Sequence, residues 1–399
     1  FITYVPGSTL GNPDLRWEKT TTTNLGLDLA LFKSRINLSV DLYNNESDNL
    51  LISNKIPSST GYTNQIQNLG SIRNRGVELI LNTVNVRTNN FSWMTDFNIS
   101  FNRSKVLALY GDSELNYFIQ DYNSRMGYKV EVGSPLGQYY GLIYDGIYTT
   151  NDFTQNGDGS YILNDDVPYL KGSARAGVKP GDVKYKDVAG EKDANGFPVF
   201  SVNDRTVIGN AQPKFMGGLN NTFTYKGFDL TLFMNFVYGN EVFNMSTQRF
   251  IGPYMANQNS VAKMGNRFML IDPQTGKEAT DLERLAALNP NQHGSSILWN
   301  ISQNNKTAIS DHSSYYLEDG SYLRLNTITF GYTLPTQLVQ KAKISNVRLY
   351  CTLNNIHTFT SYTGYDPEVS ASGSALTPGI DDSSYPRSKS WVVGVNLTF

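Results

Sequence analysis

The last residues of the chain alternate between apolar and polar side chains. Apolar residues occupy every second position from Trp391 to Phe399, and Val392, Gly394, Asn396 and Thr398 lie between them. In an extended strand, this pattern places the two kinds of residue on opposite faces. A tilted strand of about 9–11 residues crosses a bilayer, and aromatic side chains mark both interfaces. The segment 389–399 is therefore predicted to be a membrane-spanning β-strand with one face toward lipid and one toward water.

The same alternation recurs along the chain. Leucines at alternate positions in 25–31 are followed by a short polar turn at 33–35 and by a second alternating segment at 36–42. This arrangement predicts a hairpin with one apolar and one polar face. Similar strands are predicted around 77–81, 91–102, 215–225, 228–238, 322–334 and 347–359. The sequence predicts an all-β, transmembrane antiparallel β-barrel with about nine to eleven strands in this chain.

The predicted strand at 322–334 changes phase in its middle. Leu323 and Leu325 lie on the face opposite to that of the apolar residues that follow, which begin with Ile328. An extra residue in one strand shifts the register by one position. We therefore expect a β-bulge near Asn326 or Thr327.

The predicted strands are joined alternately by short turns and by long polar segments. The long segments are 51–71, 107–214, 239–316 and 360–388. We expect an extra hairpin around 138–148 and a helical turn near 280–288. Outer-membrane barrels have short periplasmic turns and long extracellular loops, so 107–214 is expected outside and the C-terminus in the periplasm. Because complete bacterial barrels have an even strand number, we expect the missing strands to precede Phe1.

The composition agrees with strands that have two different faces. Charged residues make up 17% of the 399 residues, aromatic residues 12%, and the net charge is −2. This charge gives no electrostatic reason to expect a nucleic-acid partner. Cys351 is the one cysteine, which excludes an internal disulfide and a cysteine-based zinc site. No apolar run approaches the roughly 18 residues of a membrane helix, so a membrane location requires strands.

Catalytic chemistry has little support in the sequence. No pair of histidines among His293, His312 and His357 has the spacing of a metal-binding motif. The neighbouring carboxylates at 165–166 and 381–382 are expected to be solvated loop residues, since nothing near them supplies a pocket. We expect that the protein is not an enzyme and has no cofactor, with calcium in the loops as the one alternative.

Two oxygen-rich segments leave the calcium question open. Glu191, Asp193 and Asn195 imitate the start of a calcium loop, but the twelfth position is Val202 instead of the bidentate glutamate. The second segment contains Asp152, Asn156 and Asp158. Either a divalent ion is bound here, or these residues form ordinary turns.

Aromatic side chains supply candidates for two other roles. Stacking on loop tyrosines and tryptophans is a common way to hold sugars and peptides. By this chemistry the candidate substrate-binding residues are Tyr139, Tyr140, Trp299, Tyr362 and Tyr365; contacts with a partner or loop packing are the alternative. The candidate lipid-interface residues are Trp17, Trp93, Tyr225, Tyr238, Trp391 and Phe399.

Several motifs in a fixed order resemble one known family. They are GNPDLRWE at 11–18, Asn68 to Glu78 with Gly70, Asn74 and Gly76, GSPLGQYYG at 133–141, PGDVKYKD at 180–187, DRTVIGN at 204–210, EDGSYLRL at 318–325 and GYDPE at 364–368. Together they cover essentially the whole chain. The sequence resembles the C-terminal part of the SusC/RagA-like TonB-dependent transporters.

The resemblance implies a barrel of about 22 strands with a plugged lumen. It also implies import of large nutrients, oligosaccharides or peptides, across the outer membrane of a Gram-negative bacterium. The implied partners are the TonB complex, a SusD-like surface lipoprotein that acts as a lid, and a second transporter–lipoprotein pair. The plug and the first half of the barrel have no counterpart in 1–399. The alternatives are a barrel with a structural or adhesive role and a barrel-embedded hydrolase.

Overall fold

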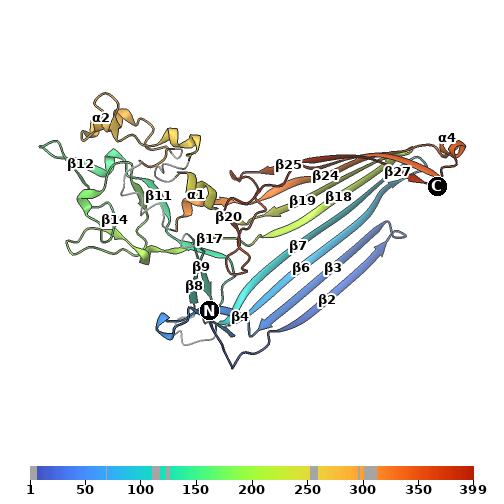
Figure 1. Ribbon diagram of the computed structural model, residues 1–399, viewed down its shortest axis with the longest axis horizontal. Coiled ribbons are helices and arrows are strands. Elements are labelled where there is room, and N and C mark those ends of the chain that lie inside the picture. Colours follow the sequence, from blue (N-terminus) through green and yellow to red (C-terminus); the bar gives the residue numbers. More distant parts are fainter. Residues whose placement is uncertain are drawn as a thin grey trace, which may run out of the picture.

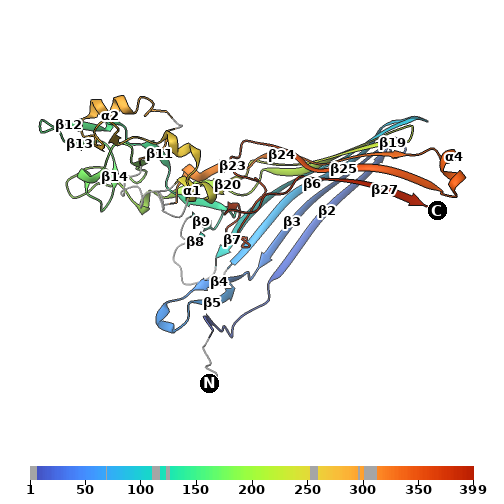
Figure 2. The same cartoon turned by 45° about the horizontal axis from the view of Figure 1, so that its top comes forward.

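A computed structural model describes residues 7–68, 70–109, 117–122, 126–251, 259–294, 297–300 and 312–399. It contains a long curved sheet, and at one end of that sheet a lobe of short strands and helices (Figures 1 and 2). No helix in these ranges is long and apolar enough to cross a membrane.

Nine strands form the long sheet within the described residues, as the alternation predicts. Each strand is antiparallel to its neighbours, and the order in the sheet follows the order in the chain. The strands are β2 (Lys19–Leu31), β3 (Ile36–Asp48), β6 (Gly70–Arg87), β7 (Phe91–Leu109), β18 (Phe215–Tyr225), β19 (Phe228–Tyr238), β24 (Tyr322–Thr333), β25 (Asn346–Thr360) and β27 (Ser390–Thr398).

The register joins the apolar positions of these strands into one continuous face. Residues directly opposite each other in an antiparallel pair point to the same side. One row across the sheet runs through Leu29, Leu38, Leu81, Phe97, Leu219, Met234 and Leu325. Many side chains on this face are exposed, for example Leu25 at 69% and Val393 at 66%. Such a large exposed apolar surface needs lipid or protein to cover it.

Short turns connect the strands at the end of the sheet opposite the lobe (Figure 1). The turn between β18 and β19 has Lys226 at φ 46° and Gly227 at φ 88°. Positive φ at both central residues defines the type I′ hairpin turn, whose twist matches that of the flanking strands. The connection from β24 to β25 carries the short helices α4 (Thr336–Val339) and η7 (Gln340–Ala342).

The expected bulge lies at Asn326 in β24. On one side, Phe233 pairs with Thr327 and Met234 pairs with Leu325, so Asn326 has no opposite residue. The register toward β25 shifts at the same point. The bulge puts Leu323 and Leu325 back on the apolar face, and Arg324 consequently points to the polar face.

The lobe is built from short strands contributed by distant segments. Its four-stranded sheet contains β8 (Tyr117–Tyr122), β9 (Met126–Glu131), β10 (Gln138–Gly141) and β17 (Thr206–Asn210). Smaller sheets pair β11 (Tyr144–Ile147) with β15 (Val183–Tyr185), β12 (Phe153–Gln155) with β13 (Tyr161–Leu163), β14 (Tyr169–Leu170) with β16 (Val199–Phe200), and β21 (Ile271–Asp272) with β22 (Lys277–Glu278). A three-stranded sheet joins β20 (Glu241–Asn244), β23 (Leu317–Asp319) and β26 (Ile380–Asp381).

Two helices and an aromatic core complete the lobe. The helices are α1 (Met245–Ile251) and α2 (Leu282–Leu288), and α2 lies where the helical turn is predicted. Tyr128, Tyr185 and Phe243 are fully buried in a core cluster that unites segments between 126 and 380. Apolar burial therefore holds the lobe together without long strands.

Two loop predictions are wrong in detail. The segment 138–148 is not a hairpin, because β10 pairs with β9 and β17 whereas β11 pairs with β15. The segment 51–71 is not a plain loop: β4 (Leu51–Lys55) pairs with β5 (Asn64–Asn68), which also pairs with β1 (Thr9–Leu10). In addition, β7 continues to Leu109, two residues into the region expected to be loop from 107.

Glycines on the polar face make room for large side chains of the next strand. The ring of Tyr43 occupies the space that a Cβ would need at Gly76, and Tyr350 occupies the same space at Gly394. Both pairs are directly opposite in the register. An aromatic ring over a strand glycine covers backbone that the missing side chain leaves bare.

We predict that Gly76→Ala lowers the stability of the full-length protein by about 2 kcal/mol or more, because overpacking displaces side chains or backbone. A Cβ there would overlap the Tyr43 ring and the carbonyl oxygen of Phe101. The control is Gly218→Ala on the same face, where the nearest atoms are 3.4 Å away. Urea unfolding in lipid vesicles measures both changes; equal midpoints would contradict this account of the packing.

Candidate functional site

The polar face of the long sheet is lined by acidic and amide side chains that bond to each other across strands. The hydroxyl of Ser39 donates to the carboxylate of Asp28 at 2.5 Å. Asp96 accepts from Asn82 at 2.9 Å and from Asn220 at 3.2 Å. Asp41 and Glu78, a directly opposite pair, add further carboxylates. The face therefore offers a hydrated, hydrogen-bonding surface with an acidic bias.

A half-buried ion pair spans three strands of this face. Arg348 of β25 donates to Asp229 of β19 through Nε at 3.0 Å and Nη2 at 2.5 Å. The pair passes over Gly331 of β24, where a Cβ would come within 2.5 Å of both partners. A bidentate guanidinium–carboxylate contact fixes both side chains. This ion pair therefore links β25 to β19 near the short-turn end of the sheet.

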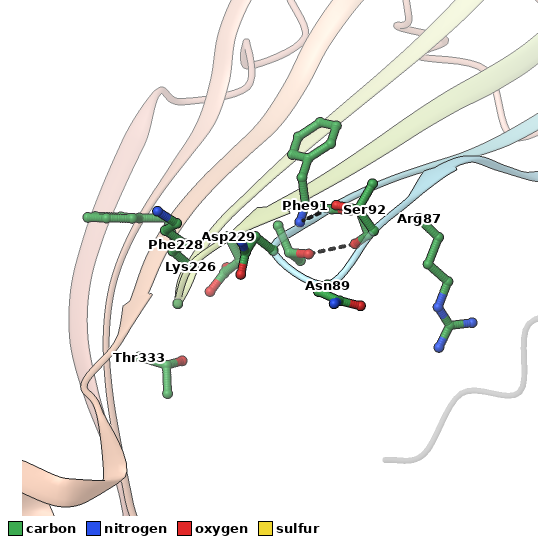
Figure 3. Close-up of a pocket in the computed structure, with 12 residues that line it drawn as sticks. Arg87, Asn89, Phe91, Ser92, Lys226, Phe228, Asp229 and Thr333 are labelled. Atoms are coloured by element: carbon green, nitrogen blue, oxygen red, sulfur yellow. Dashed lines mark hydrogen bonds between the residues drawn. The ribbon is translucent and has the colours of Figure 1, made fainter.

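A pocket of about 470 Å³ lies beside this ion pair at the short-turn end (Figure 3). The hydroxyls of Ser92 and Thr224 meet at 2.5 Å in its wall, and Thr88 bonds to both backbone groups of Phe91. Arg87, Lys226 and Asp229 give the pocket charges of both signs. Its lining also includes Asn89, Asn90, Gly227, Phe228 and Thr333.

At the other end, Arg324 fastens the last long loop to the sheet. Its side chain is 2% exposed; Nη2 lies 2.5 Å from Asp366 and Nη1 lies 3.4 Å from Glu368. Glu368 is also 3.0 Å from Arg387. We call these four residues the loop clasp. The buried charges of Arg324 and Asp366 stabilise each other, because water reaches neither of them.

A second set of bonds fastens the same loop to the lobe. Glu318 of β23 accepts from the backbone N–H of Thr363 at 2.7 Å, from its hydroxyl at 2.8 Å and from Asn244 at 2.9 Å. Tyr362 donates to Asp381 at 2.7 Å. Burial raises the pKa of the Tyr362 phenol, and the Asp381 hydrogen bond raises it further. Tyr362 therefore stays a neutral donor at physiological pH.

Comparison with known proteins identifies this arrangement. The family described as "TonB dependent receptor-like, beta-barrel" matches residues 2–179. TonB-dependent receptor P39 of Formosa agariphila is 32% identical over 411 residues, which cover 98% of this chain and 36% of that protein. The chain belongs to the TonB-dependent receptor β-barrel family.

Other relatives extend this identification. SusC of Bacteroides thetaiotaomicron is 27% identical over 97% of this chain and 32% of its own length. The RagAB peptide importer in the "closed-closed" state superposes with a TM-score of 0.68 at 22% identity, over 97% of this chain and 36% of the other. At this identity the superposition shows the fold alone. The chain spans about a third of the length of the relatives it matches.

The structure separates the five predicted substrate residues of this receptor chain into two groups. Tyr139 is 0% exposed and Trp299 is 2% exposed, both in the lobe core, and Tyr362 is 6% exposed beside Asp381. These three offer no surface for cargo in this conformation. Tyr140 is partly exposed and Tyr365 is 79% exposed. A substrate role stays a prediction and now rests on the last two.

The predicted calcium ligands do not converge. Asp152 accepts from the backbone N–H and hydroxyl of Thr149, and Asp158 accepts twice from Ser160. Asp193 accepts from Tyr169, and Glu191 accepts from Lys171, Ser201 and Asn203. Asn195 and Asn156 take part in the same turns. In the described ranges no three acidic, histidine or cysteine side chains are placed to share a metal, so calcium stays a prediction that this geometry does not favour.

His312 is the buried histidine among the three considered for catalysis. It is 6% exposed, and its Nε2 lies 3.3 Å from Asp121. Burial lowers the pKa of His312, and the nearby Arg205 charge lowers it further. The imidazole is therefore neutral at pH 7. The prediction that the paired carboxylates are solvated is confirmed for Asp165, whose side chain is 84% exposed, and is wrong for Asp381, which is 1% exposed because it lies in β26 of the lobe.

The predicted interface aromatics lie near the two ends of the apolar face. Tyr225 and Phe399 lie at the short-turn end, and Tyr238 and Trp391 lie toward the lobe. Trp17 precedes β2 and is 92% exposed. Trp93 stacks on Phe223 with ring centroids 5.7 Å apart. Their contact with lipid stays a prediction, which these positions support.

Polar residues interrupt the apolar face near the short-turn end, and they bond to one another. Asn221 accepts from the indole of Trp93 at 2.9 Å and from the hydroxyl of Thr95 at 2.7 Å. Asn85 donates to Thr95 at 2.7 Å and accepts from Thr83 at 2.9 Å. Side chains in lipid must satisfy their hydrogen bonds within the protein, and this chain of bonds does so.

Arg324 was not identified from the sequence as the residue that holds the last long loop. The motifs EDGSYLRL and GYDPE carry the family resemblance, but Arg324 and Asp366, which bond to each other, lie 42 positions apart in the chain. The phase change in 322–334 is the feature of the sequence that could have identified Arg324, because a bulge turns this side chain away from lipid.

We predict that Arg324→Met releases the loop 361–389. The substitution leaves Asp366 buried without its cation, which costs about 3–5 kcal/mol. Limited proteolysis of the full-length protein should then cut within 361–389, and the Tm should fall. The control is Arg387→Met, whose side chain is 49% exposed and whose loss should cost at most about 1 kcal/mol. Identical cleavage in the two variants would refute the clasp.

We also predict that Asn221→Ala destabilises the receptor by about 1–3 kcal/mol, because Trp93 and Thr95 lose their acceptor. Asn220→Ala is the matched control on the water-facing side of the same strand and should change stability by about 0.5 kcal/mol or less. Unfolding in lipid vesicles, followed by tryptophan fluorescence, compares the two. An unfolding midpoint that is unchanged by Asn221→Ala would show that this network does not stabilise the sheet.

Proposed function

We propose that the full-length protein imports large nutrients, oligosaccharides or peptides, across the outer membrane. The observation that carries this proposal is the division of the long sheet into a continuous apolar face and a polar face, in a chain related over 98% of its length to TonB-dependent receptors. Water-filled and substrate-conducting barrels have a polar interior and an apolar exterior. The polar face then forms part of the inner wall.

The chemistry of that wall suits a hydroxyl-rich or cationic cargo. Its carboxylates at Asp28, Asp41, Glu78 and Asp96 can accept from hydroxyl, amide and ammonium groups. An anionic cargo would meet repulsion along the same surface. This supports sugars and peptides as a class without selecting one of them.

Energy and access would come from partners. We propose that TonB drives transport through a plug, that a SusD-like lipoprotein covers the mouth, and that the lobe and loop 361–389 form the docking rim for that lid. SusC and the RagAB peptide importer support this by relationship. A second transporter–lipoprotein pair completes the proposed assembly.

Uptake assays test the proposal. Cells that express the full-length protein should deplete one class of labelled oligosaccharide or peptide, and cells without TonB should not. The inner-wall variant Asp96→Arg should slow uptake of a cationic or neutral cargo, whereas the outward-facing Lys19→Gln should not. Unchanged uptake in cells that lack the protein, together with lost attachment to a surface, would favour the adhesive alternative.

A further inference from the structure

A group of cations lies just beyond the apolar face, on the side toward the lobe. In the register of β6 and β7, the last apolar pair is Val77 with Phe101, and the next outward pairs are Arg75 with Arg103 and Arg73 with Lys105. At about 3.4 Å per residue, these cations begin about 7 Å past the lipid-facing pair. We call these four residues the basic collar.

The charges of the basic collar are only partly compensated. Arg73 lies 3.9 Å from Glu46, at the limit of an ion pair. Arg75 uses Nε to donate to Asn44 at 2.8 Å, and Arg103 uses Nη1 to donate to backbone carbonyls at 2.7 and 2.9 Å. An arginine has five N–H donors, so these bonds orient the guanidinium groups and occupy only some donors.

The neighbouring charges favour an anion at this site. Glu46 and Asp48 lie on the outward face of β3, and Asp48 is directly opposite Lys19 of β2. Lys214, whose carbonyl accepts from Arg103, adds another exposed cation beside β18. In the ranges that the structure describes, one carboxylate, that of Glu46 on β3, lies within ion-pair distance of any of the four collar cations on β6 and β7.

We infer that the basic collar binds the phosphorylated head group of a lipid in the outer leaflet. The lipid-facing pair Val77 and Phe101 continues directly into the collar, so acyl chains and phosphates of one molecule contact both. Arginine binds phosphate oxygens through paired N–H groups. The inference requires the long loops to face outward, as in outer-membrane barrels, and it is independent of the transported cargo.

A soluble acidic protein would match the charges but not the position. The collar begins directly beyond the apolar face, at the level of the lipid head groups, so a soluble protein would have to displace head groups to reach it. A lipid phosphate has the right charge and already lies at this level. A protein partner is therefore an outcome that the experiment can reveal, and the lipid is the occupant that the geometry supports.

Native mass spectrometry of the full-length receptor, titrated with diphosphoryl lipid A, monophosphoryl lipid A or phosphatidylcholine, tests the inference. We expect tightest binding to the diphosphoryl form. The double variant Arg75→Gln/Arg103→Gln should bind it about thirtyfold more weakly, because each basic residue near an anionic lipid surface contributes about 1 kcal/mol. Lys19→Gln, at a similar height but opposite Asp48, should bind as the wild type does.

Three results would overturn the inference. One is equal binding of diphosphoryl lipid A and phosphatidylcholine; another is an equal loss of binding in Lys19→Gln. The third is displacement of the lipid by millimolar inorganic phosphate, which would indicate a free-anion site. A heat-dependent shift on gel electrophoresis verifies that each variant is folded, and Lys105→Gln supplies a second test if the double variant fails to assemble.

Discussion

The absence of water in a bilayer core is the constraint on which this structure depends. Every backbone N–H and C=O there must be paired inside the protein, and the continuous ladders of the long sheet meet that requirement. Once the backbone is paired, side chains have only two directions. Each strand must then place lipid-compatible groups on one side and water-compatible groups on the other.

Polar side chains are hydrogen-bonded differently on the two faces of the sheet. On the outward face, Asn221, Thr95 and Asn85 are bonded among themselves, because lipid offers no partner. On the inner face, Asp96 and its amide neighbours form a looser set that water can join. The cations of the basic collar lie just beyond the apolar face, where lipid is replaced by aqueous surroundings. One sheet thus changes its chemistry both across its thickness and along its length.

The local alternation of apolar and polar residues predicted the long sheet, whereas the lobe depends on contacts between distant segments and could not be predicted from it. The strand period of two was enough to place nine strands and the bulge at Asn326. The lobe escaped prediction, because β10 and β11 pair with segments that local pattern cannot choose.

Side-chain roles were harder to predict for a related reason. A tyrosine in a loop has the same chemistry whether it stacks on cargo or fills a core, and only the fold showed that Tyr139 is buried. Likewise the partner of Arg324 follows after another strand and a turn. Composition and spacing contain no information on such pairings, whereas alternation depends only on adjacent residues.

The bulge at Asn326 makes the loop clasp a check on assembly. Had β24 paired with β19 without the bulge, Arg324 would face lipid and could not reach Asp366. Loop 361–389 can therefore close only on a sheet whose strands are aligned correctly on both sides of β24. A receptor with a slipped strand would leave loop 361–389 open and accessible to proteases.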